Sequence, residues 1–169
     1  MTDKPATPVT FARLLDRDTR ILAMRDHSEA EFRRKITQSA ARAAMRHDEP
    51  AEEIPEALLE ELIAWCYEHN WLDDARFAQR FVVSRSRKGY GPQRIRMELA
   101  QKGIGRELAE TALSEAEIDW AAQAFDAAER KFGLPLPQDW KQKSKVLRYL
   151  QAKGFFMEDI QSIYRNNDD

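Results

Sequence analysis

Basic side chains gather around a short turn in the middle of the sequence, 89–92, which reads Gly-Tyr-Gly-Pro. Proline suits the first turn of a helix, so the spacing predicts a helix that begins at Pro92. Free N–H groups at a helix start, with Arg and Lys on both sides, can hold an anion such as a phosphate or a carboxylate. Tyr90 could stack on a base or anchor a protein contact. The alternative is an inter-helix turn that needs glycine for its backbone angles, with Tyr90 covering the edge of the core. The candidate binding residues of this segment are Arg85, Arg87, Lys88, Tyr90, Arg94, Arg96 and Lys102.

A second basic group lies closer to the C-terminus and supplies the remaining candidate binding residues, Lys141, Lys143, Lys145 and Arg148. Its alternative interpretation is a solvated helix face. Both groups belong to a block pattern that the net charge of -2 conceals. Residues 76–106 carry nine bases and one acid, whereas residues 48–75 carry ten acids and no Lys or Arg. Such alternation makes surface patches of a single sign, which favour charged partners, although neighbouring blocks could also pair with each other.

The residues that usually serve catalysis or metal binding are sparse and scattered. His27, His47 and His69 lie far apart, and the single cysteine, Cys66, falls on an apolar helical face where a buried thiol is expected. Acidic pairs such as those at 60–61 and 73–74 are adjacent in sequence, so their side chains do not converge on a helix. We therefore expect no catalytic site, no metal and no cofactor. The glycines at 89–91 do not match a dinucleotide-binding fingerprint either, because they follow a predicted helix and a third glycine is missing.

Composition and length bound the class of protein. The chain has 169 residues, 43% of them hydrophobic and 33% charged, which is enough apolar material for a core. It shows no run of about 18 apolar residues and no N-terminal apolar segment of a secretory signal. One cysteine cannot form an internal disulfide. We expect a monomeric protein of the cytoplasm without membrane contact.

Helical periodicity runs through nearly the whole sequence. Apolar residues recur at helical spacing in stretches such as 58–66, 77–82 and 121–132, and no stretch alternates as a half-buried strand would. Capping boxes that start at Ser28 and at Ser114 mark two predicted helix starts. The predicted fold class is therefore all-α.

An internal repeat organises these helices. Leu99, Lys102 and Gly103 recur at an offset of 51 as Leu150, Lys153 and Gly154, and each Gly is predicted to be a left-handed helix C-cap. A weaker first copy begins at Ser28. The simplest interpretation is three tandem three-helix repeats in an elongated, curved array. The predicted parts are a flexible tail over 1–10, repeat 1 over 11–72 with an extended loop near 39–53, repeat 2 over 73–116 and repeat 3 over 117–166.

Three aromatic residues, Trp65, Tyr67 and Trp71, crowd the predicted junction of the first two repeats. Packing between repeats is the favoured interpretation, and a surface for a partner is the alternative.

The residues of the second repeat closely resemble the central repeat of the RecX family. The resemblance is carried by Trp71-Leu72-Asp73-Asp74, by the basic run Ser84 to Pro92 and by Glu98-Leu99 with Lys102-Gly103-Ile104. The segment from Arg25 to Glu31 resembles the entry to that family's first repeat, and the segment from Tyr149 to Ile160 resembles its third.

The resemblance implies a regulatory protein without catalytic activity, whose partner is the RecA recombinase in its filament on single-stranded DNA. RecX-like proteins lie in the groove of that filament and restrain its growth, recombination and coprotease activity. Direct DNA contact is left open. The alternative hypothesis is a non-specific DNA-binding protein without a dedicated protein partner, and salt dependence would help to distinguish the two.

Overall fold

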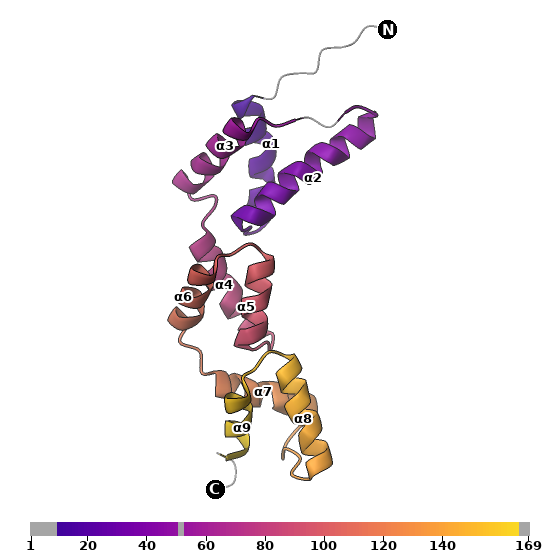
Figure 1. Ribbon diagram of the computed structural model, residues 1–169, viewed down its shortest axis with the longest axis vertical. Helices are drawn as coiled ribbons and strands as arrows, with labels where there is room; N and C mark the ends of the chain where they lie inside the picture. The colour runs from indigo at the N-terminus through magenta and orange to yellow at the C-terminus, as the bar shows by residue number, and fades with distance from the viewer. Residues whose placement is uncertain (1–9, 51–52, 166–169) are drawn as a thin grey trace. The chain divides into compact units, whose positions relative to one another are not determined.

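The computed structural model describes residues 10–50 and 53–165, and the regular secondary structure of these ranges is entirely helical (Figure 1). No helix of these ranges is both long enough and apolar enough to cross a membrane. The chain divides into two compact units, unit 1 up to Asp74 and unit 2 from Ala75 onward. The helices are α1 (Phe11–Met24), α2 (Glu29–His47), α3 (Glu56–Glu68), α4 (Asp74–Arg87), α5 (Pro92–Gln101), α6 (Arg106–Glu115), α7 (Trp120–Phe132), α8 (Trp140–Ala152) and α9 (Met157–Arg165).

Helices α1 to α3 enclose the core of unit 1. Leu14, Phe32 and Leu62, one from each helix, are almost completely buried in it. The predicted cap at Ser28 is confirmed, because its hydroxyl oxygen accepts a hydrogen bond from the Glu31 N–H at 3.2 Å. This side chain satisfies one of the N–H groups that the first turn of α2 leaves without a helical partner.

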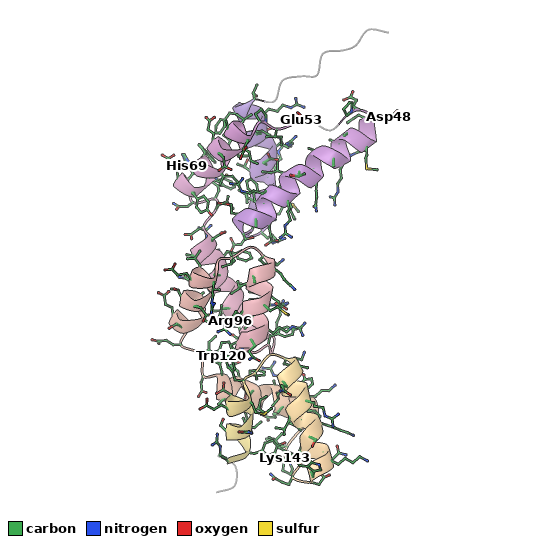
Figure 2. All side chains as sticks on the ribbon, in the orientation of Figure 1. Asp48, Glu53, His69, Arg96, Trp120 and Lys143 are labelled. Atoms are coloured by element: carbon green, nitrogen blue, oxygen red, sulfur yellow. The ribbon has the colours of Figure 1, made fainter. Side chains whose placement is uncertain are left out.

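Unit 2 holds two hydrophobic clusters, one built by α4–α6 and one by α7–α9. Val82, Ile95 and Leu99 are fully buried in the first cluster. Leu150 and Phe155 are fully buried in the second. The half-buried Trp120 at the start of α7 packs against both clusters (Figure 2). The fold is therefore all-α and built from three-helix sets, as the periodicity predicts.

The repeat of Gly103 and Gly154 has the predicted geometry. Their φ angles are 79° and 98°, in the left-handed region. The N–H of Ile104 donates to the carbonyl oxygen of Leu99 at 3.0 Å, and the N–H of Phe155 donates to that of Leu150 at 3.2 Å. These bonds close both helices in the same Schellman turn, so α5 and α8 end alike.

Two local predictions are wrong. The extended loop near 39–53 is shorter than predicted, because α2 continues to His47 and ends at Asp48 with φ 49°. Alanine is the strongest helix former, and the alanines at positions 40, 41, 43 and 44 favour this extension. Ser114 does not cap a helix, since it lies inside α6, and α7 is capped instead by Asp119, whose carboxylate accepts from the Ala122 N–H at 3.1 Å. Of the predicted tail over 1–10, residues 1–9 lie outside the described residues.

Candidate functional site

The predicted basic turn joins the two three-helix sets of unit 2. The N–H of Gly91 donates to the carbonyl oxygen of Lys153 at 2.8 Å, and the N–H of Gln93 donates to that of Gly154 at 2.9 Å. The prediction that the start of α5 offers free N–H groups to an anion is therefore wrong. The carbonyl groups that follow α8 already occupy this position, and their partial negative charge suits a helix N-terminus. We call this contact the joint.

The joint brings two glycines into close approach. A Cβ atom at Gly91 would lie 2.4 Å from the carbonyl carbon of Gly154, and one at Gly154 would lie 2.5 Å from the Cβ of Arg94. Such distances are far below van der Waals contact. The two backbones can meet only because neither residue has a side chain.

Three cations surround the Tyr90 ring beside the joint. The guanidinium carbons of Arg85 and Arg94 lie 4.7 and 4.5 Å from the ring centroid, and the Lys153 Nζ lies 4.7 Å from it. Glu98 accepts two hydrogen bonds from Arg85 at 2.7 and 2.8 Å and one from Arg94 at 3.3 Å. The hydrogen bonds from Arg85, and secondarily Arg94, lower the pKa of Glu98 against the raising effect of its burial. Tyr90 is half-buried and packs against the α4–α6 cluster, as expected if it covers the edge of the core.

Two other candidates of this segment also have contacts within the chain. The guanidinium of Arg96, on α5, forms an ion pair with the carboxylate of Glu110, on α6 (Figure 2). This pairing lowers the pKa of Glu110. Lys102 is half-buried and forms the C-cap of α5. Much of the positive charge around the turn is therefore compensated inside unit 2.

Arg87 and Lys88 differ from these residues because both are exposed. Within the described part of the chain, no carboxylate pairs with either of them. They lie at the C-terminal end of α4, where basic side chains also suit the helix dipole. Together with four further residues, Gln79, Arg80, Val83 and Ser84 of α4, they line an open hollow of about 580 Å³. We call this the α4 surface.

The second predicted group lies on α8. Lys141, Lys145 and Arg148 follow one another at helical spacing, are exposed, and pair with no carboxylate of the described residues. Lys143 behaves differently, because its Nζ lies 4.4 Å from the centroid of the Tyr164 ring (Figure 2). We call the three exposed bases the α8 stripe.

Sequence comparison places these helices in a known family. A model of the RecX second three-helix domain matches residues 73–113, and a model of the RecX third three-helix domain matches residues 117–163. The chain belongs to the RecX family. The matched ranges contain the joint and the two basic surfaces, so those features lie within RecX three-helix domains.

Curated relatives agree over nearly the full length. The Regulatory protein RecX of Cronobacter sakazakii is 54% identical over 166 residues, which cover 98% of this chain and 99% of the relative. That of Serratia proteamaculans is 54% identical over 162 residues, which cover 90% and 96%. The chain is therefore a regulatory protein of the RecX family.

Solved RecX structures share the fold. The crystal structure of RecX from Lactobacillus salivarius matches with a TM-score of 0.76 at 20% identity, over 94% of this chain and 96% of that one. A crystal structure described as regulatory protein RecX matches with a TM-score of 0.71 at 23% identity, over 92% of this chain and 73% of that one.

Sequence reasoning missed a third basic surface, in unit 1. Lys35, Arg42 and Arg46 of α2 line a hollow of about 290 Å³ together with Ile21 and Met24 of α1. The spacing of the three bases, at seven and four residues, places them along one side of a helix. The sequence contains this spacing, but Arg42 and Arg46 fall in the stretch near 39–53 that is predicted from the sequence to be a loop.

Proposed function

We propose that this RecX-family chain binds the RecA filament on single-stranded DNA and inhibits its growth, recombination and coprotease activity. The observation that supports this proposal most strongly is the exposed positive charge of Arg87, Lys88 and the α8 stripe, with which no carboxylate of the described residues pairs. Exposed cations without carboxylate partners raise the local concentration of an acidic partner and speed its association. The proposed action is steric and electrostatic, because the exposed cations attract an acidic partner and the bound chain blocks extension of the filament.

The joint supports the proposal because it connects the helix sets that carry the two basic surfaces. Two backbone hydrogen bonds, together with the packing of Trp120 against both clusters, link α4–α6 to α7–α9. Both surfaces therefore belong to the same compact unit. A partner that engages both gains from the linkage, because the second contact forms at a high effective concentration.

The proposal assigns binding to the residues whose charge is exposed. These are Arg87, Lys88 and the α8 stripe, whereas Arg85, Arg94 and Arg96 hold carboxylates of the chain. Tyr90, Lys102 and Lys143 then act indirectly, through the geometry of unit 2.

Reversing two charges on the α4 surface tests the proposal. The Arg87→Glu/Lys88→Glu variant should keep helicity and melting temperature, because surface changes away from packed features usually alter stability by within about 0.5 kcal/mol. We expect it to lose most of its inhibition of RecA strand exchange and RecA ATP hydrolysis on single-stranded DNA.

The matched control is Arg130→Glu/Arg165→Glu, which makes the same change in charge at two exposed residues of unit 2 outside both basic surfaces. This control should inhibit like the wild type. Full inhibition by the Arg87/Lys88 variant would remove the α4 surface from the proposal. Full inhibition after the further reversal of Lys141 and Lys145 would overturn the proposal for unit 2, and the basic hollow between α1 and α2 would be tested next.

A further inference from the structure

Trp140 presents an indole to solvent at the start of α8. Its side chain is 80% exposed, whereas Trp71 is 39% exposed and Trp65 and Trp120 are half-buried against hydrophobic clusters. Exposing a large aromatic ring forfeits the free energy that its burial would supply. Trp140 therefore contributes little to the core of unit 2, and its ring is available to a ligand.

The surroundings of Trp140 on α8 are basic. The helix Trp140–Ala152 has no Asp or Glu, and the α8 stripe begins at the next residue, Lys141. The carboxylate before the helix, Asp139, is engaged as its N-cap and accepts from the Gln142 N–H at 3.3 Å. The stripe runs from Lys141 to Arg148, which spans about 10 Å along the helix axis.

An exposed aromatic ring beside a track of cations matches the chemistry of a single nucleic-acid strand. The faces of unpaired bases stack on aromatic rings, and the cations follow the phosphates. A duplex hides its base faces inside the stack, so it could use the cations but not the ring. The cores of protein interfaces are enriched in tryptophan but depleted in lysine, so the lysines beside Trp140 favour the nucleic-acid interpretation.

We propose that Trp140 and the α8 stripe form a contact site for single-stranded DNA, in which a base stacks on the indole and Lys141, Lys145 and Arg148 bind phosphates. The inference deepens the proposed function, on which it rests, because it assigns the strand of the filament to α8. The α4 surface then remains for the protein partner.

The test uses the full chain and a 20-residue thymidine oligonucleotide, without RecA. Wild-type tryptophan fluorescence should be quenched on titration, and this quenching should disappear in Trp140→Phe because the stacked indole is gone. Trp140→Phe should retain affinity to within about threefold, since phenylalanine also stacks. Trp140→Ala should lose about 5- to 150-fold in affinity, the range measured for base–aromatic stacking.

Charge and strand controls complete the experiment. Lys141→Glu/Lys145→Glu should weaken binding and reduce the salt slope of log K by about 1.4, because each phosphate contact on a single strand contributes about 0.7. Trp71→Ala, at the less exposed tryptophan, should bind the oligonucleotide like the wild type. Against a duplex of the same length, Trp140→Ala should also match the wild type.

Three results would overturn the inference. They are wild-type affinity in Trp140→Ala, quenching that persists in Trp140→Phe, and quenching of Trp140 by RecA alone but not by the oligonucleotide, which would make the ring a protein anchor. Because RecA is absent from the DNA titration, its failure leaves the inhibition assay of the α4 surface unaffected. Conversely, intact DNA binding in a chain that does not inhibit RecA would overturn the proposed function alone.

Discussion

Replacing Gly91 with alanine perturbs the joint at a single atom. The new Cβ would lie 2.4 Å from the carbonyl carbon of Gly154 and from the backbone nitrogen of Phe155, whereas ordinary contact begins at 3.4 Å. Both neighbours are backbone atoms, so no side chain can rotate away. The two turns must separate by about 1 Å to accommodate the methyl group.

This separation breaks the hydrogen bonds of the joint. The bonds to the carbonyl oxygens of Lys153 and Gly154, now 2.8 and 2.9 Å long, would lengthen to nearly 4 Å, beyond useful hydrogen-bond distance. Each of these two hydrogen bonds contributes a net ~1 kcal/mol to stability. Overpacking typically costs a further ~1–3 kcal/mol in strain. We expect Gly91→Ala to lower the free energy of unfolding of unit 2 by about 3–5 kcal/mol.

Urea unfolding followed by circular dichroism measures this loss. The matched control is Gly105→Ala, since a Cβ there meets nothing within 4 Å and the residue has an ordinary φ of -61°. Gly105 is the N-cap of α6, where alanine is a poorer cap than glycine, so this change should lower stability by about 1 kcal/mol or less. Equal stability of the two variants would refute the steric account of the joint.

Two further predictions concern unit 1. Burial, and secondarily the negative charge of Asp18, raises the pKa of the Cys66 thiol to about 11. At pH 8 the folded protein should therefore react with a thiol reagent at least about a hundredfold more slowly than the urea-unfolded chain. Equal reaction rates would contradict the burial of Cys66. Burial also lowers the pKa of His27 below its ordinary 6.5, against the raising effect of the hydrogen bond to the Arg25 carbonyl. The unfolded chain then takes up the proton first as the pH falls, so the melting temperature of unit 1 should decrease below about pH 6.5, and His27→Gln should flatten that decrease; an unchanged slope in the variant would assign the pH effect to another group.

Features fixed by residues close in sequence were predictable. The cap at Ser28 needs only the N–H three residues later, and the turns at Gly103 and Gly154 need only glycine after a helix and an apolar residue beyond it. The helical faces follow from spacing alone. Such features depend on local geometry, which the sequence expresses directly.

Features made by distant partners were not predictable in this way. The start of α5 is occupied by the carbonyl groups of Lys153 and Gly154, and every residue has a carbonyl, so no residue type marks this contact. Arg85 is a predicted binding residue, but the turn between α4 and α5 brings it to Glu98. Its guanidinium therefore pairs with that carboxylate. Ser114 shows the opposite case. The residues from Ser114 to Glu117 match a capping box, but α7 is capped by Asp119 instead.

The joint also has a consequence for sequence divergence and for engineering. Its hydrogen bonds join backbone atoms, so positions 91 and 154 must be glycine, which has no Cβ. The other residues of the joint need only their backbone N–H or carbonyl group. Surface side chains on α4 and α8 can therefore be exchanged widely without changing how the two helix sets meet. A library that randomises the exposed positions of these helices while keeping the two glycines should consist largely of folded proteins. The same backbone frame could then be redirected to partners of different charge.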